Sequence, residues 1–99
     1  MLTQQLKDFM YNHIPQIADI ILQKFATDYH YYLDYKSLDS EEITLDHFVV
    51  RTVEERKDDT NFISLFIIDA TEIEPKMVGD AIKYKPSLKK IIRKEITKI

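Results

Sequence analysis

Three histidines, at positions 13, 30 and 47, are the side chains of this 99-residue sequence best suited to acid–base or metal chemistry. His30 precedes Asp34 by four residues, a spacing that on a helix gives a surface pair more often than a catalytic dyad. No two histidines have the spacing of metal ligands on one element. We therefore predict no catalytic residues and no metal or cofactor site, and expect a protein that is not an enzyme. The alternative is a site that folding assembles from a histidine and distant carboxylates.

The contents of cysteine and glycine exclude further kinds of chemistry. The sequence has no cysteine, which removes disulfides, thiolate metal sites and thiol catalysis. Gly79 is its single glycine, whereas phosphate-binding loops need several at fixed spacing. Carboxylates cluster at 39–42, 54–55, 58–59 and 72–74, but none of these clusters has the ligand pattern of a calcium loop. We interpret them as solvated strand ends and turns. The alternative is an acidic patch that mimics nucleic acid or occupies a basic groove on a partner.

Positive charge is concentrated at the C-terminal end of the sequence. Residues 76–99 hold 8 Lys and Arg against 2 Asp and Glu, whereas residues 1–75 hold 6 against 15, within a net charge of −3. Five of the cations fall on a predicted amphipathic helix: Lys89, Lys90, Arg93, Lys94 and Lys98. Such a helix can pack through its apolar side and leave the cations solvated, or bind an acidic protein, or contact nucleic-acid phosphates. A membrane surface comes last, because this helix has no Trp or Phe.

Four tyrosines stand close together: Tyr29, Tyr31, Tyr32 and Tyr35. Aromatic rings can stack on the bases of single-stranded nucleic acid. No Lys or Arg lies between these rings, however, and the carboxylates of residues 28 and 34 would repel phosphate. On a helix, Tyr29 and Tyr32 would join the core stripe, and Tyr31 and Tyr35 would lie beside it. Because tyrosine is enriched at protein interfaces, we predict Tyr31 and Tyr35 as interface residues.

The elements that must position these side chains begin with a long helix. Between Ile14 and Leu33 the apolar residues follow spacings of 3 and 4, which predicts an amphipathic helix. Its stripe consists of Ile14, Ile17, Ala18, Ile21, Phe25, Tyr29 and Tyr32. A similar stripe runs through residues 2–13, and Pro15 interrupts the pattern because proline cannot donate a backbone hydrogen bond. We therefore expect either a kink or two helices that meet near residues 13–15.

Two strands are predicted after this helix. Residues 43–55 are rich in β-branched side chains, and residues 62–73 form a second such run. The polar cluster at 57–61 separates them, so the sequence predicts an antiparallel hairpin. Alternation along the second strand places Phe62, Phe66 and Ile68 on one face, and Ile63, Leu65 and Ile67 on the other.

The stretch from Pro75 to Pro86 allows two interpretations. Residues 77–82 have helical spacing, which Gly79 weakens, whereas Ala81 to Lys85 suits a short third strand. After Pro86, Ser87 is a suitable N-cap for the C-terminal helix. The apolar side of that helix consists of Leu88, Ile91, Ile92, Ile96 and Ile99.

These patterns predict a single α+β domain over residues 1–99. It would combine a kinked or broken N-terminal helix, an antiparallel hairpin with or without a third strand, and a basic C-terminal helix. Both faces of the strand at 62–68 are apolar, and a chain of this length has little material to cover both. We therefore predict that another chain completes a face or an edge of the hairpin through Ile63, Leu65 and Ile67. The alternative is a monomer whose helices cover both faces.

Composition narrows the class of function. The 31% of charged residues and the lack of any apolar run of about 20 residues argue against a membrane protein. The N-terminal sequence does not predict a signal peptide, so we expect a cytoplasmic protein. A content rich in Ile, Lys and Tyr, without cysteine, resembles that of small proteins encoded by phages or archaeal viruses, and it implies the host cytoplasm or the virion. We expect a protein–protein interaction domain that binds another protein or itself, as an assembly component or an inhibitor of a host protein. The alternative is a nucleic-acid-binding protein that uses the basic helix.

Overall fold

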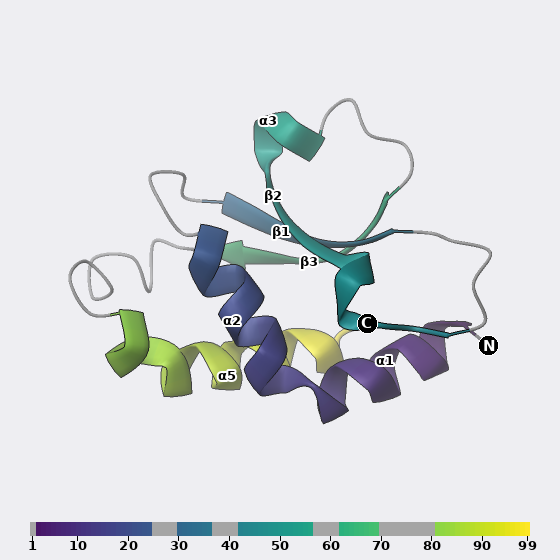
Figure 1. The fold of residues 1–99 in the computed structure, drawn as a ribbon, viewed down its shortest axis with the longest axis horizontal. Helices are drawn as coiled ribbons and strands as arrows, with labels where there is room; N and C mark the ends of the chain where they lie inside the picture. Colours follow the sequence, from purple (N-terminus) through teal and green to yellow (C-terminus); the bar gives the residue numbers. More distant parts are fainter. Residues whose placement is uncertain (1, 25–29, 37–41, 57–61, 70–80) are drawn as a thin grey trace.

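The computed structural model describes residues 2–24, 30–36, 42–56, 62–69 and 81–99 (Figure 1). The elements follow the order α1 (Leu2–Asn12), α2 (Ile14–Lys24), β1 (His30–Lys36), the 3-10 helix η1 (Leu45–His47), β2 (Phe48–Thr52), α3 (Val53–Arg56), β3 (Phe62–Asp69) and α5 (Ala81–Thr97). Helices together with a three-stranded antiparallel sheet confirm the predicted α+β class.

The three strands form one antiparallel sheet in the order β2-β1-β3. In the register of the central strand, Leu33 lies opposite Val50 of β2 on one side and Phe66 of β3 on the other. The predicted hairpin is therefore wrong. Both of its strands exist, but they occupy opposite edges of the sheet and pair with β1 instead of with each other.

The central strand comes from a segment that we predicted to be helical. α2 ends at Lys24, so the continuation of this helix to Leu33 is wrong, while Phe25 and Tyr29 lie outside the described residues. Tyr31, Leu33 and Tyr35 alternate along β1 and are 0%, 0% and 2% exposed. Aromatic side chains suit a strand that packs against neighbours on both sides, and this burial outweighs the helical spacing of the tyrosines.

The break between α1 and α2 is confirmed, in the form of two separate helices. α1 ends at Asn12 and α2 begins at Ile14. Pro15 stands in the first turn of α2, where a missing N–H costs nothing because it would have no intrahelical partner. The His13 N–H donates to the Met10 carbonyl at 3.1 Å, which closes the last turn of α1.

The helices α1, α2 and α5 form a layer on one face of the sheet, and α3 lies on the other side of it (Figure 1). The core lies between this layer and the sheet, and it consists of Leu6, Met10, Ile14, Ile17, Ala18, Ile21, Tyr31, Leu33, Tyr35, Phe48, Val50, Phe66, Ile68, Leu88, Ile92 and Ile96. Tyr11 Oη and Thr97 Oγ1 form a hydrogen bond of 2.8 Å between α1 and α5. Lys85 Nζ lies 2.6 Å from Asp19 Oδ1 and joins α5 to α2.

The C-terminal helix is longer than predicted. α5 begins at Ala81, so a third strand over Ala81–Lys85 is wrong, and the third strand of the sheet is β1. Ser87 is not the N-cap, because α5 continues through Pro86 in its interior. The predicted apolar side is confirmed in Leu88, Ile92 and Ile96, which are all 0% exposed. Residues 77–80 lie outside the described residues.

β3 carries a β-bulge. Leu33 lies opposite Phe66, and the next residue of β1, Asp34, lies opposite Ser64. Leu65 is therefore an extra residue of β3 without a partner in this register. Beyond a bulge the alternation of side chains between the two faces shifts by one residue.

This shift changes which side chains of β3 share a face. Phe66 and Ile68 face the helix layer and are 6% and 0% exposed. Phe62, opposite Lys36, lies on the other face, where the guanidinium of Arg51 stands 4.1 Å from the centre of its ring. The predicted grouping of Phe62 with Phe66 and Ile68 is therefore wrong.

Candidate protein-interaction surface

The strongest candidate for a functional surface runs along the outer edge of β3. Over the described ranges of the chain, no strand pairs with this edge. Ile63 and Ile67 are 43% and 52% exposed, and Leu65 is half-buried. The partners of the two isoleucines on β1 are Tyr35 and Tyr32, which alternate to opposite faces, so exposed isoleucines flank the edge on both sides. An uncharged apolar edge of this kind is open to contact with another chain.

A hollow of about 390 Å³ lies beside this edge, between β3 and the C-terminal end of α5. Its lining consists of Tyr32, Ser64, Leu65, Phe66, Ile67, Glu95, Lys98 and Ile99. β3 contributes mainly apolar side chains to the lining, and α5 contributes the acid Glu95. The two residues that follow α5 contribute the base Lys98 and the apolar Ile99. The volume is in the range of sites that receive apolar groups of a binding partner.

The two charged residues of the lining form an ion pair. Lys98 Nζ lies 3.0 Å from Glu95 Oε1, with the two side chains 60% and 22% exposed. Because Lys98 is well solvated, the pair contributes only about 0–1 kcal/mol to stability. The margin of the hollow is therefore close to neutral, and its ion pair can be exchanged for another at little cost.

The structure separates the predicted interface residues into two groups. Ile63, Leu65 and Ile67 all lie on the β3 edge described above, although the bulge prevents them from sharing one face. Tyr31 and Tyr35 lie in the core between β1 and the helices, at 0% and 2% exposed. Their predicted place on the outside of a helix is wrong because the segment is a strand, so they do not contribute to the candidate surface.

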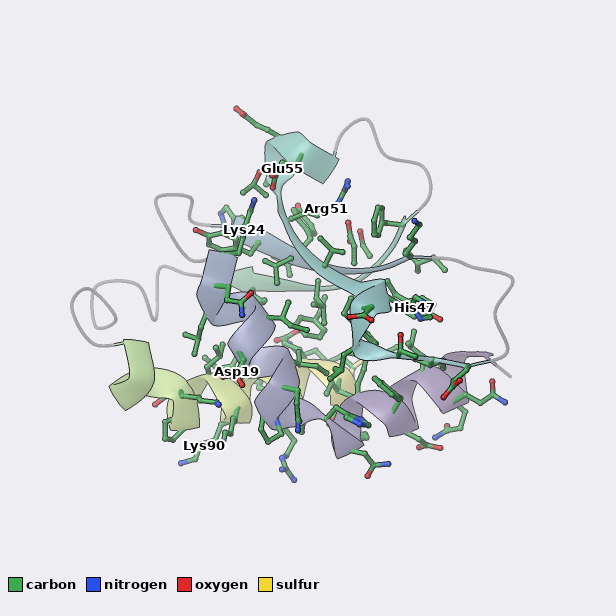
Figure 2. The ribbon with its side chains drawn as sticks, viewed as in Figure 1. Asp19, Lys24, His47, Arg51, Glu55 and Lys90 are labelled. Atoms are coloured by element: carbon green, nitrogen blue, oxygen red, sulfur yellow. The ribbon has the colours of Figure 1, made fainter. Side chains whose placement is uncertain are left out.

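The cations of α5 form a second candidate surface. Lys90, Arg93 and Lys94 are exposed, and Lys89 is half-buried. Lys90 points away from the sheet, on the outer side of the helix layer (Figure 2). The cations that form ion pairs in this part of the described chain are Lys85 and, just beyond the end of α5, Lys98, so the four cations named above have no carboxylate partner among the described residues.

The three histidines serve separate local roles. His13 Nδ1 lies 2.8 Å from the Phe9 carbonyl oxygen, and its ring stacks on that of Phe9 at 4.1 Å. His47 Nδ1 accepts a hydrogen bond of 3.2 Å from the Thr44 N–H at the start of η1. His30 is exposed at the beginning of β1. The residues that the structure describes contain no group of three or more His, Cys, Asp or Glu that could hold a metal ion.

Sequence reasoning missed a buried carboxylate. Asp34 is 1% exposed, and its Oδ1 has no hydrogen-bond partner. It lies opposite Val49 and Ser64, on the face of the sheet turned away from the helix layer. In a helix, Asp34 would fall on the polar side, whereas alternation through Tyr31, Leu33 and Tyr35 would have placed it on the second face of a strand.

Sequence reasoning also missed the capping box that starts α3. The Thr52 N–H donates to Glu55 Oε2 at 2.9 Å, and the Glu55 N–H donates to Thr52 Oγ1 at 3.4 Å. Lys24 at the end of α2 reaches Glu55 Oε1 at 2.8 Å (Figure 2). The hydrogen bond from Lys24, followed by that from the Thr52 backbone, lowers the pKa of Glu55 to about 2. The Thr-x-x-Glu spacing in the sequence could have marked the end of the strand at Thr52.

A second hollow of about 350 Å³ lies at the opposite edge of the sheet, between α2 and β2. Its lining consists of Ile20, Gln23, Lys24, Phe48, Val49 and Val50. The strongly exposed large apolar side chains of the described part are Val53, Ile63 and Ile67, none of which belongs to this lining. The β3 edge is therefore the better candidate for an interface.

No protein-family model, curated protein or solved structure matches this chain. In the described part of the chain, no helix is long and apolar enough to cross a membrane. The class is defined by the fold alone: an α+β protein whose three-stranded antiparallel sheet carries a helix layer on one face and leaves the edge at β3 unpaired within the described residues.

Proposed function

We propose that this protein is a small non-enzymatic interaction domain that binds another protein, or a second copy of itself, through the outer edge of β3. The observation that carries the proposal is the presence of Ile63 and Ile67, both about half exposed, on an edge strand beside a largely apolar hollow. Covering such side chains gains roughly 25 cal/mol for each Å² of apolar surface removed from water.

The resemblance in composition to small phage- and virus-encoded proteins favours two roles for such a domain. It would act as a component of an assembly, or as an inhibitor that occupies the surface of a host protein. Both roles need a binding surface and no active site. An inhibitor of a host protein would be located in the host cytoplasm. An assembly component would be located in the virion.

Site-specific photo-crosslinking tests this function. A benzophenone amino acid in place of Ile67 is expected to crosslink a defined protein, while the same group in place of the exposed Gln16 on α2 does not. The captured protein is then purified and its affinity measured directly. Ile67→Lys should weaken that affinity by about tenfold or more, since it places a charge in an apolar contact.

Two results would overturn the proposal. One is equal crosslinking from both positions, which would mean that the captured species are collisional. The other is the absence of any crosslinked partner, including a second copy of the chain, from position 67.

Nucleic-acid binding is the second candidate function. The observation that favours it is the exposure of Lys90, Arg93 and Lys94 without carboxylate partners among the described residues. Side chains three and four residues apart lie on one side of a helix, so these cations can contact neighbouring phosphates.

Fluorescence anisotropy with a short DNA duplex and with single-stranded RNA tests this candidate. Three phosphate contacts predict a slope of about −3 for the DNA duplex and about −2 for the single-stranded RNA, for the logarithm of affinity against the logarithm of salt concentration. The triple variant Lys90→Glu, Arg93→Glu and Lys94→Glu should abolish binding, whereas Lys36→Glu, an exposed cation on β1, should not. Failure of the unaltered protein to bind either probe at low salt would remove this candidate.

A further inference from the structure

The surface around the β3 edge is complementary to itself. Residues 62–68 carry no charged side chain, so two such strands can approach without opposing like charges. The margin of the adjacent hollow contains one base, Lys98, and one acid, Glu95. In an isologous contact the same patch of both partners meets across a two-fold axis. In a patch with an apolar centre and one charge of each sign, the apolar centres can then pack together and each charge can meet the opposite charge of the partner.

We propose that the occupant of this surface is a second copy of the chain. Two β3 edges meet antiparallel across a two-fold axis, Ile67 of each copy enters the hollow of the other, and Lys98 of each copy pairs with Glu95 of the other. This inference rests on the proposed function and names its partner.

The neutrality of the margin is what favours a second copy over a charged peptide. A strongly acidic segment would meet Glu95 and a strongly basic one would meet Lys98, and in either case the 3.0 Å pair would have to be broken without a replacement. In a two-fold dimer the number of ion pairs is conserved, because two pairs within the copies become two pairs between them. The net electrostatic change is small, and burial of Ile67 drives association.

The bulge at Leu65 sets the strength of this dimer. A bulge bends an edge strand and interrupts the regular spacing of its outer N–H and C=O groups, so a continuous ladder of backbone bonds between the two copies cannot form. Association therefore rests on side chains around Ile67. We expect a small and reversible interface, with dissociation constants of about 1–100 µM, in place of a permanent dimer.

Sedimentation equilibrium over about 1–500 µM protein provides the first test. The unaltered protein is expected to show a reversible monomer–dimer equilibrium. Ile67→Lys should raise the dissociation constant by about tenfold or more. Val53→Lys is the matched control, because Val53 is 45% exposed, similar to Ile67 at 52%, but lies on α3 away from the hollow.

A charge-reversal mixture tests the exchanged ion pair. In Glu95→Lys alone the two copies oppose lysine to lysine, and in Lys98→Glu alone they oppose glutamate to glutamate, so each variant should dimerise more weakly. An equimolar mixture of the two variants restores opposite charges across the axis and should form a heterodimer. No pair within a single chain can produce this result, because both variants carry like charges at the two positions.

Three outcomes would overturn the dimer: a monomer throughout the concentration range, a dimer that Ile67→Lys does not weaken, or a mixture that dimerises no better than its components. Each of them leaves the proposed function standing if position 67 still crosslinks a different protein. The absence of any crosslinked partner from position 67 would remove the dimer and the proposed function together.

Discussion

Asp34 is an unfavourably placed side chain of the central strand. Its carboxylate is almost fully buried, and Oδ1 has no hydrogen-bond partner. Removing a polar oxygen from water without a replacement bond costs about 1–3 kcal/mol. Asp34 is therefore expected to lower the stability of the folded protein.

Replacement of Asp34 by valine should stabilise the protein. Valine is apolar, suits a strand and removes the buried carboxylate, so the free energy of unfolding should rise by about 1–3 kcal/mol. Urea unfolding followed by circular dichroism measures the difference. Val49→Thr, which adds a hydroxyl at the neighbouring position of β2, serves as the opposite control and should destabilise. Destabilisation by Asp34→Val would show that the carboxylate makes a favourable interaction in solution.

Glu55 should make stability depend on pH in the acid range. Its pKa falls from an ordinary value of 4.5 to about 2 in the folded protein, because Lys24 and the Thr52 N–H stabilise the carboxylate. The folded state therefore binds fewer protons, so the contribution is present above pH 4.5 and is lost as the pH falls toward 2. Since the side chain is 47% exposed and its ion pair is screened, we expect no more than about 1 kcal/mol.

Urea unfolding between neutral pH and pH 2 checks this expectation, with Glu55→Gln as the comparison. The variant should be less stable at neutral pH, and the difference should shrink as the pH falls. A difference that stays constant across this range would mean that the carboxylate charge plays no part, and that only the shape of the capping side chain matters.

At the scale of elements, helical periodicity predicted secondary structure correctly where the pattern within one segment was sufficient to determine it. Ile14, Ile17 and Ile21 gave α2 correctly, and Leu88, Ile92 and Ile96 gave the buried side of α5. The secondary-structure prediction failed where contacts with neighbouring strands determine the conformation. The tyrosines around Leu33 fit a helical stripe and a strand equally, and only pairing with β2 and β3 selects the strand.

The interaction surface was predictable only in part, because some of its features depend on the local sequence and others on contacts between elements. An apolar run without charges at residues 62–68 indicates an unprotected strand from sequence alone, so Ile63, Leu65 and Ile67 could be named. The bulge, the hollow and its ion pair could not be predicted, because they depend on the register between β1 and β3 and on where α5 ends.

Pro86 provides a test of where α5 begins. A proline in a helix interior costs about 3 kcal/mol relative to alanine, because it removes a hydrogen bond and crowds the preceding turn. Since α5 extends from Ala81, Pro86→Ala should stabilise the protein by up to about 3 kcal/mol, while Ser87→Ala changes stability by much less. The reverse order, with loss of stability in Ser87→Ala, would show a helix that begins after Ser87 and uses Ser87 as its N-cap.

At the scale of the whole molecule, one core connects the helix layer to the sheet. Ile17 of α2 and Leu33 of β1 are both 0% exposed within it, so neither layer can open without exposing the other. We expect unfolding to be a single transition, as is usual for one small domain.

Truncation of Ile17 should therefore weaken both layers together. Ile17→Ala is expected to cost about 2–5 kcal/mol, which is a large part of the roughly 5–15 kcal/mol typical of a domain. Ile20→Ala, at a half-buried position of the same helix, should cost clearly less. Far-UV circular dichroism of the helices and the infrared amide I band of the strands should report the same midpoint. Separate midpoints would show that the two layers unfold independently.

The hydrogen bond between Tyr11 and Thr97 spans 86 residues of sequence, and it has a consequence for synthesis on the ribosome. The surface of α1 and α2 against which α5 packs is translated well before α5 itself. Until α5 has left the ribosome, the apolar side chains of α1 and α2 that it covers in the folded protein remain exposed to water. This nascent chain should therefore be most prone to aggregation before α5 emerges, and binding by a chaperone at that stage should reduce the aggregation.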